Sequence, residues 1–187
     1  MEPGQPPVVV GVLLAAGAGR RYGKPKALVE GWLTAAVRAL RDGGCDHVVV
    51  VLGAAAVPVP AGVTTVTAPD WQRGLSASVR AGLTHIADTA DYAVLHVVDT
   101  PDVGAAVIAR VVERALASRS GLARAVFGAR PGHPVVIARR HFTGVIETLS
   151  GDQGAGPYLR AAHDVDNVDC SGLASGRDHD EPPKLPG

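Results

Sequence analysis

The chain has 187 residues with 18 basic and 18 acidic side chains, so its formal net charge is zero. That balance argues against a general nucleic-acid binder, which usually carries an excess of Lys and Arg. No apolar run reaches the roughly 18 residues of a membrane-spanning helix, so no membrane partner is expected. The two cysteines, Cys45 and Cys170, are far apart and form no CxxC motif, so we expect a reducing, cytoplasmic location and no zinc site.

Aliphatic runs alternate with amphipathic stretches along the chain. In order, the aliphatic runs predict strands at residues 8–14, 47–52, 63–66, 93–98, 123–127, 135–138 and 165–168. Apolar side chains at helical spacing predict helices at residues 32–40, 75–86, 103–116, 140–149 and 158–162. This alternation predicts an α/β fold with three layers, in which a mostly parallel, Rossmann-like sheet has helices on both faces. We expect a single domain at 8–183, with tails at 1–7 and 184–187.

The most unusual residues follow predicted strands. Gly- and cation-rich residues 17–26 come after the first strand, Asp99 follows the strand at 93–98, and Gly132-His133-Pro134 lies between two later strands. In open parallel sheets, ligands collect at the carboxyl ends of the strands. We therefore expect these segments to contribute to one site.

Residues 17–26 have the composition of a loop that wraps around a polyphosphate. The loop contains three glycines and four cations, namely Gly17, Gly19, Gly23, Arg20, Arg21, Lys24 and Lys26. Glycine lets main-chain N–H groups approach an anion closely, and the N-terminus of a following helix adds a favourable dipole.

Two common templates for such loops do not fit. A Walker A loop needs GxxxxGK followed by Ser or Thr, but Gly19 and Gly23 are one residue too close and Pro25 follows Lys24. A dinucleotide fingerprint needs GxGxxG and an acid after the second strand, but the glycine spacing is again off by one and residues 51–54 contain no acid.

A third pattern does fit. Residues 14–26, LAAGAGRRYGKPK, resemble the nucleotidyltransferase signature LAAGxGxRxGxPK. Later segments resemble further motifs of the same family: GLSASVRAGL at 74–83, DTP at 99–101, GHP at 132–134, GDQGA at 151–155 and DHDEP at 178–182. The resemblance covers about residues 8–183 and is greatest to the molybdenum cofactor cytidylyltransferases and molybdopterin guanylyltransferases.

This resemblance implies the fold of nucleotide-diphospho-sugar transferases. It also implies an enzyme that moves CMP, or another NMP, from an NTP to a phosphorylated small-molecule acceptor, with molybdopterin cofactor as the expected acceptor and pyrophosphate as the leaving group. In this branch LAAG is similar to the cytidylyl version of the motif and LAGG to the guanylyl version, so CTP is the expected nucleotide. A molybdoenzyme that receives the cofactor is an implied partner.

The chain departs from the family pattern at two positions. Val98 stands where the family usually has glycine, and this change leaves Asp99 in place. Gly156 stands where the GDxGAR motif has arginine, which removes a cation from the substrate side and leaves the acceptor open.

The first motif and its charges assign the nucleotide side of the site. We expect Arg20, Arg21 and Lys26 to hold the triphosphate, with Lys26 foremost because Pro25 fixes its approach and the family motif ends there. Lys24 is expected to be exposed. Further nucleotide contacts are expected from backbone groups around the base and from two hydroxyls near the ribose or base: Leu14, Ala15, Ala16, Gly17, Gly19, Ser76 and Ser78. The two serines have an alternative role as caps of the helix at 75–86.

Asp99 is the expected Mg²⁺ ligand, since magnesium takes one or two carboxylates together with phosphate oxygens and water. Asp102 is the expected N-cap of the helix at 103–116, which leaves Asp99 free. The second carboxylate is expected from Asp178 or Asp180, and we favour Asp180. Together with Arg21 and Lys26, Asp99 makes up the expected catalytic set, because nucleotidyl transfer needs positioning and charge neutralisation but no protein nucleophile.

The acceptor side is less defined by sequence. His133, in a glycine-proline loop at a strand start, and Asp152, in a glycine-rich loop, are the expected acceptor contacts. His96 lies inside a predicted strand and is expected to be a packed core residue. Trp71 fits either a hydrophobic lid or ordinary packing.

Two other functions remain open at this point. One is an NAD(P)H-dependent oxidoreductase similar to nicotine blue oxidoreductase, against which the missing acid of the second strand and the presence of Asp99 argue. The other is a non-catalytic nucleotide-binding factor for molybdoenzyme maturation, which Gly156 keeps open.

Overall fold

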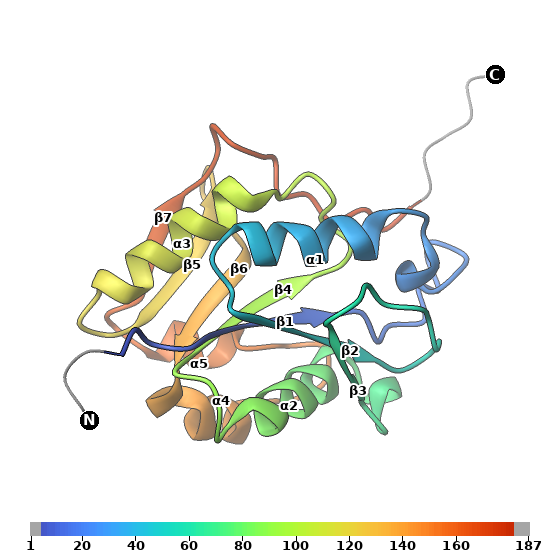
Figure 1. The fold of residues 1–187 in the computed structure, drawn as a ribbon, viewed down its shortest axis with the longest axis horizontal. Coiled ribbons are helices and arrows are strands. Elements are labelled where there is room, and N and C mark those ends of the chain that lie inside the picture. The colour runs from blue at the N-terminus through green and yellow to red at the C-terminus, as the bar shows by residue number, and fades with distance from the viewer. Residues whose placement is uncertain (1–4, 182–187) are drawn as a thin grey trace.

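A computed structural model of the protein describes residues 5–181 and contains a seven-stranded sheet in the order β3-β2-β1-β4-β6-β5-β7 (Figure 1). The strands are β1 Val9–Leu14, β2 His47–Leu52, β3 Thr64–Thr67, β4 Tyr92–Val97, β5 Leu122–Phe127, β6 Arg130–Ala138 and β7 Asp166–Asp169. The helices are α1 Trp32–Asp42, α2 Leu75–Ile86, α3 Ala105–Ala117, α4 Phe142–Thr148 and α5 Gly156–Ala161. Short 3-10 turns lie at Lys26–Leu28, Trp71–Arg73 and Arg139–His141.

The sheet is mostly parallel, as the alternation of strands and helices predicts. β1 pairs in parallel with β2 and β4, β2 with β3, and β5 with β7, whereas β6 runs antiparallel to both β4 and β5. Helices α1 and α3 cover one face, and α2, α4 and α5 cover the other (Figure 1). The expected three-layer α/β fold is therefore confirmed.

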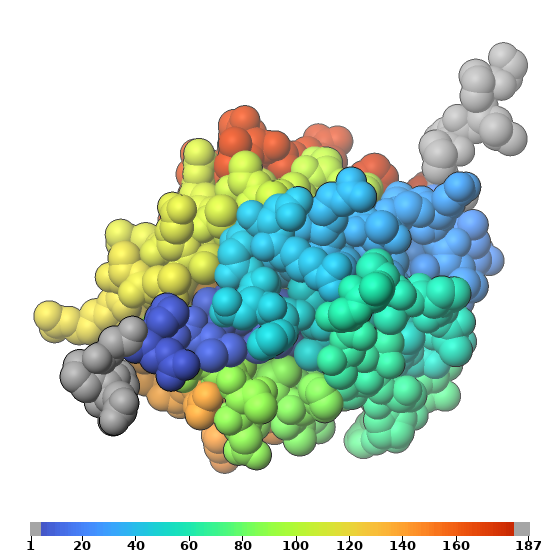
Figure 2. All heavy atoms as spheres, viewed as in Figure 1, coloured from blue at the N-terminus to red at the C-terminus, as the bar shows by residue number. Residues whose placement is uncertain are grey.

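β1 lies at the centre of the sheet and is buried along its whole length. Val9 and Leu13 pack into the core beneath α1 and α3, while Val10, Val12 and Leu14 pack into the core beneath α2. A strand covered on both faces needs a continuous apolar run rather than alternation, which explains the aliphatic sequence of this segment. In the space-filling view, side chains of α1 and α3 meet over one face of the sheet (Figure 2).

Helix α2 lies close to the sheet because of one glycine. A Cβ at Gly82 would lie 2.5 Å from Cγ1 of Val12, which is too close for a real contact. Glycine therefore lets the helix pack directly on β1, and the packing fixes the first turn of α2 beside the carboxyl end of that strand.

The antiparallel strand β6 is longer than the sequence predicts. It covers Arg130–Ala138 instead of 135–138, and Gly132-His133-Pro134 lies inside the strand instead of in a loop. Phe127 pairs with Arg130 across a tight turn, so β5 and β6 form a hairpin. The glycine and proline residues indicate a break, and residues 132–134 indeed lie at an irregularity in the pairing with β5. Residues 130 and 131 on one side and 135–138 on the other are paired, so the strand continues through this point.

The expected tail at 184–187 lies outside the described residues, as do residues 1–4 of the expected N-terminal tail. Residues 5–7 have no regular secondary structure and are exposed. Within the described part of the chain, no helix combines the length and the apolar character needed to cross a membrane.

Candidate functional site

The glycine loop turns back on itself directly after β1. The Gly23 N–H donates to the Gly19 carbonyl at 2.9 Å, and Gly19 has a φ of 60°. A Cβ at Gly19 would overlap the carbonyl oxygen of Lys24, so only glycine fits here. This turn carries the chain to Pro25 and the 3-10 turn that begins at Lys26.

Before this turn, the backbone still follows the sheet. The Ala15 N–H donates to the Val51 carbonyl at 3.0 Å, and the Ala54 N–H donates to the Ala16 carbonyl at 2.9 Å. Trp71 packs against this corner, since a Cβ at Gly53 would lie 2.5 Å from the Cβ of Trp71 and 2.9 Å from that of Ala16. Because Ala15 and Ala16 are small, the start of the glycine loop can pack directly against the end of β2 and Trp71.

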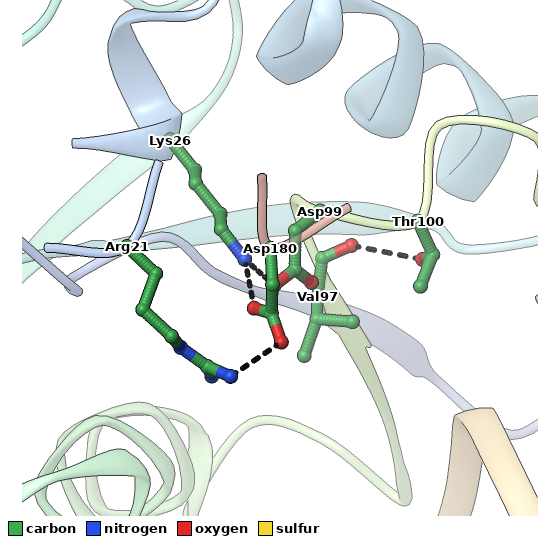
Figure 3. Close-up of polar contacts among 6 residues, drawn as sticks. All are labelled: Arg21, Lys26, Val97, Asp99, Thr100 and Asp180. Carbon is green, nitrogen blue, oxygen red and sulfur yellow. Dashed lines mark hydrogen bonds and ion pairs between the residues drawn. The ribbon is translucent and has the colours of Figure 1, made fainter. Parts of the chain in front are cut away.

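Lys26 joins two carboxylates that are distant in sequence. Its Nζ lies 2.6 Å from Oδ2 of Asp99 and 2.8 Å from Oδ1 of Asp180 (Figure 3). Arg21 reaches the other oxygen of Asp180, with its Nη1 3.0 Å away. The side chain of Lys26 is 13% exposed, whereas that of Arg21 is 76% exposed, so Lys26 is the enclosed cation of this cluster.

The charges of the cluster support one another. Burial lowers the pKa of Lys26, but hydrogen bonds and charge interactions with Asp180 and Asp99 outweigh it, and the pKa is raised above its ordinary value. The hydrogen bond from Lys26 in turn lowers the pKa of Asp180. Lys26 and Asp180 are therefore both charged near neutral pH.

Asp99 lies just beyond β4, where a backbone hydrogen bond from Val98 N–H to the Leu14 carbonyl extends the pairing with β1. Val98 is 4% exposed and packs in the core, so the side chain that replaces the family's glycine is accommodated without moving Asp99 away from Lys26. The hydroxyl of Thr100 donates to the Val97 carbonyl and closes the turn after the strand (Figure 3).

Residues 173–181, which we call the C-terminal strap, bring Asp180 to the site. Asp102 accepts hydrogen bonds from the N–H and the hydroxyl of Ser175, both at 2.7 Å. The expectation that Asp102 caps a helix is therefore wrong: α3 begins at Ala105 with Gly104 as its N-cap, and Asp102 anchors the strap. Ser175 lies 73 residues from Asp102, so the residues around Asp102 give no sign of this contact.

Further contacts hold the strap on both sides of Asp99. Arg130 donates to the carbonyls of Ser175 and Gly176, at 2.8 and 3.1 Å. The His179 N–H donates to the Asp99 carbonyl at 2.9 Å, and its ring packs edge-on against Trp32 with centroids 5.7 Å apart.

A cavity of about 230 Å³ opens beside this cluster. Its apolar wall comes from β1, α2, β4, β6 and α5, and includes Leu14, Leu75, Val79, Leu95, Val135 and Leu159. Its polar lining consists of Arg124, Arg130, His133 and Asp178. Gly156, in place of the family's arginine, lies at the same cavity with Gly154 and Ala155.

Two titratable groups of the cavity influence each other. Burial lowers the pKa of His133, although Asp178 and Asp99 oppose this. Burial raises the pKa of Asp178, and the negative charge of Asp99 adds to the effect. The strap thus presents Asp180 to Lys26 and Asp178 to the cavity.

The other predicted site residues lie around this centre. Ser76 and Ser78 are buried in the first turns of α2, whose N-cap is Gly74, so no serine side chain caps the helix. Asp152 lies against Gly74 instead of lining the cavity, because a Cβ at Gly74 would overlap its Oδ1. His96 is 1% exposed, as expected for a core residue.

The remaining cations of the loop are not part of the enclosed cluster. Arg20 and Lys24 are exposed and make no ion pair with other residues in 5–181. Gly17 is also exposed, with open space where a side chain would project. Arg124 and Arg130 of the cavity were not expected from sequence, because neither lies in one of the recognised motifs.

Asp99 and Asp180 are the two side chains of this cluster that could hold a divalent cation together. Asp99 and Asp180 both face a single positive centre, the Lys26 ammonium, so their oxygens converge on one point. Among residues 5–181, no group of three or more His, Cys, Asp or Glu side chains could hold a metal ion. Two carboxylates suit Mg²⁺ or Mn²⁺ that takes its other ligands from phosphate and water.

A wider hollow of about 470 Å³ lies elsewhere, between α3 and β7, and is lined by Arg110, Glu113, Arg114, Asp166, Asn167 and Val168. It contains none of the predicted site residues. The cluster around Lys26 and the adjoining cavity therefore remain the candidate site.

Comparison with known proteins places this chain in a family. The MobA-like NTP transferase domain matches residues 11–166, which include the glycine loop and Asp99 but end before the C-terminal strap. Nicotine blue oxidoreductase from Paenarthrobacter nicotinovorans is 36% identical over 93% of this chain and 93% of its own length.

Solved structures show the same fold. Rv0371c from Mycobacterium tuberculosis H37Rv is 27% identical, with a TM-score of 0.78 over 95% of this chain and 94% of that chain. A second Rv0371c structure, a complex with manganese, has a TM-score of 0.67 and 25% identity over 87% of this chain and 88% of that one. A nucleotidyl transferase from Methanothermobacter has a TM-score of 0.77 and 21% identity over 93% and 92%.

The expected fold of nucleotide-diphospho-sugar transferases is thereby confirmed, and so is the resemblance read from the motifs. The glycine loop, Lys26 and Asp99 all lie within the matched residues, and the chain belongs to the family of MobA-like NTP transferases.

Proposed function

We propose that the protein transfers CMP from CTP to a phosphorylated small molecule, with molybdopterin as the favoured acceptor, and releases pyrophosphate. The observation that carries this proposal is the convergence of Lys26, Asp99 and Asp180 beside a cavity with an apolar wall and a polar lining. The cluster thus supplies a cation for the phosphates and two carboxylates for a metal ion. The adjoining cavity provides a volume for the second substrate.

In this mechanism the glycine loop binds the triphosphate. Backbone N–H groups after β1 and the side chains of Lys26 and Arg21 neutralise the β- and γ-phosphates that leave as pyrophosphate. A phosphate oxygen of the acceptor attacks the α-phosphorus in line with that leaving group, so the acceptor–phosphorus bond forms as the bond to the β-phosphate bridge breaks. No protein nucleophile takes part.

Asp99 and Asp180 would hold Mg²⁺ or Mn²⁺. When bound, the cation neutralises charge on the α-phosphate. The complex of Rv0371c with manganese supports a metal-dependent reaction in this family. Asp99 is fixed by the end of β4 and Asp180 by the strap, so the two ligands are placed by separate elements.

The lining of the cavity supports an acceptor that is partly apolar and anionic. Leu14, Leu95 and Val135 offer an apolar wall, while Arg124 and Arg130 offer two cations for a phosphate. His133 lines this cavity, and we propose that it contacts the acceptor. Asp152 lies beside Gly74 at the start of α2, outside the cavity lining, and stays a proposed acceptor contact. A molybdoenzyme remains the expected recipient of the product, and the cytoplasm the expected location.

The preference for CTP rests on Ala15 and Ala16. Both are buried and small, and they lie where the base-facing part of the motif begins. Ser76 and Ser78 lie at the nearby start of α2 and stay candidates for the ribose or base.

The decisive assay measures pyrophosphate release with molybdopterin, Mg²⁺ and either CTP or GTP. We expect release with CTP and a loss of about 100-fold or more in kcat for Asp99→Asn, since such charge stabilisation is worth that much in comparable sites. Asp70→Asn, at an exposed position outside the cluster, is the control and should retain activity. Unchanged turnover in Asp99→Asn would contradict the mechanism.

A second candidate function is NAD(P)H-dependent reduction of a small aromatic compound. The identity of 36% with nicotine blue oxidoreductase favours it. The end of β2 offers Leu52, Gly53 and Ala54 where a ribose-binding acid is expected, which argues against it. Thermal unfolding with each ligand separates the two: a rise in Tm with CTP and Mg²⁺ but none with NADPH supports the transferase.

A further inference from the structure

Lys26 occupies the point on which the two proposed metal ligands converge. Its Nζ lies within 2.8 Å of an oxygen from each of Asp99 and Asp180, and its side chain is largely enclosed (Figure 3). A metal ion bound to the same two oxygens would need the volume that the ammonium fills, since Mg²⁺–oxygen distances are only about 2.1 Å. Lysine and metal therefore compete for one position.

Lys26 is able to leave this position. A lysine ammonium is a point charge at the end of a flexible four-carbon chain, so it can exchange one set of anionic oxygens for another. Arg21 makes its own ion pair with Asp180 at 3.0 Å and does not contact Asp99, so it can keep hold of the strap when Lys26 moves.

We propose that Lys26 is a built-in substitute for the metal in the nucleotide-free protein, so that a divalent cation binds tightly only together with a triphosphate that draws Lys26 away. The second half of this inference rests on the proposed function, because it takes an NTP as the ligand that draws the lysine. The first half concerns the free protein alone. Metal and nucleotide then bind with positive coupling, which is necessarily reciprocal.

This arrangement has a structural use. Without a cation, Asp99 and Asp180 would repel each other, and Asp178 would add a further negative charge nearby. Lys26 offsets this repulsion and keeps the C-terminal strap docked while the site is empty of nucleotide. The carboxylates are thus held in position for the metal before it arrives.

The test is a titration of Mn²⁺ without nucleotide, with free Mn²⁺ followed by its electron paramagnetic resonance signal. Lys26→Met removes the competing ammonium, and we expect Mn²⁺ to bind about tenfold more tightly than in the wild type, within the usual range of coupling between sites. Lys24→Met is the matched control, because it removes the same charge from the same loop at an exposed position and should leave the affinity unchanged.

Adding Asp180→Asn to Lys26→Met should abolish the gain, because the released site needs both carboxylates. The inference is overturned if Lys26→Met binds Mn²⁺ no more tightly than the wild type, or if Lys24→Met gains as much. If Lys26→Met does not fold, Lys26→Gln removes the charge while keeping a hydrogen-bond donor, and the same gain in Mn²⁺ affinity is expected.

A second titration adds a CTP analogue with a methylene bridge between the α- and β-phosphates. It should tighten Mn²⁺ binding in the wild type more than in Lys26→Met, because only the wild type must first move the lysine. An equal effect in both proteins contradicts the coupling. If the analogue binds to neither protein, the proposed nucleotide substrate fails, while the titration without nucleotide still decides whether Lys26 blocks the metal.

Discussion

Gly19 carries a strict backbone constraint in the glycine loop. Its φ of 60° lies in the left-handed region, its carbonyl accepts the Gly23 N–H, and a side chain would overlap the Lys24 carbonyl. The turn that brings Lys26 to Asp99 therefore depends on the absence of a Cβ at this residue.

We predict that Gly19→Ala lowers the free energy of unfolding by about 1–3 kcal/mol, the usual cost of backbone strain at such a position. It should also weaken CTP binding, because the loop must open. Gly17→Ala is the control: its Cβ would meet nothing within 4 Å, so stability should not change. Urea denaturation and calorimetry with CTP measure both effects, and equal stability of the two variants would contradict this account.

At the scale of elements, the C-terminal strap is the segment on which the site most depends. It carries Asp178 and Asp180, and it is held by Asp102 and Arg130. Gly176 has a φ of 57° and packs against the ring of Phe127, which a Cβ would overlap. The strap's course across the strand ends thus passes through a point that only glycine fits.

We predict that Gly176→Ala lowers kcat for pyrophosphate release by about tenfold or more, because a displacement of roughly 1 Å at a catalytic group can cost 100-fold. Gly172→Ala, nearby and with nothing within 4 Å of its Cβ, should behave like the wild type. Comparable kcat values for the two variants would show that the course of the strap does not position Asp180 for the reaction.

The elements that local pattern defines could be predicted from sequence, and those defined by distant pairing could not. The apolar run of residues 8–14 predicts β1, and the motif from Leu14 to Lys26 predicts the loop that follows it and the family. The role of Asp102 could not be predicted, because its partner Ser175 lies 73 residues away. β6 is predicted too short because Arg130 and Pro131 pair with β5 ahead of the irregularity at Gly132 and Pro134, and the local sequence does not show this pairing.

At the scale of the whole molecule, the fold brings together residues that lie 73 and 154 positions from Lys26. Asp99 lies beside Lys26 because β1 and β4 are neighbouring parallel strands. A parallel sheet allows this strand order, but the sequence does not determine it. The position of Asp180 depends on the strap, so its pairing with Lys26 rested on the family motif alone. The acceptor roles of His133 and Asp152 stay predictions.

The buried core also sets the response of the protein to acid. Burial, helped by the nearby His133, lowers the pKa of His96 to about 3, from an ordinary value near 6.5. The unfolded chain therefore takes up a proton at this position below pH 6.5 while the folded protein does not. The stability linked to His96 is complete above pH 6.5 and is lost as the pH falls from about 6.5 to about 3.

We predict that His96→Leu removes this part of the pH dependence. The free energy of unfolding of the wild type should fall by up to about 1.4 kcal/mol per pH unit more steeply than that of the variant in this window. Urea denaturation between pH 4 and pH 8 measures both slopes. Parallel curves would show that His96 is protonated in the folded state.

We propose that Lys26, Asp99 and Asp180 form the site of nucleotidyl transfer from CTP. The most direct test uses CTP labelled with radioactive phosphorus at the α-position, molybdopterin and Mg²⁺, and follows the label by chromatography. We expect the label to move to the acceptor in the wild type and transfer to be lost in Asp99→Asn and in Lys26→Met. Label that stays in CTP with the wild type, or transfer that persists in both variants, would contradict it.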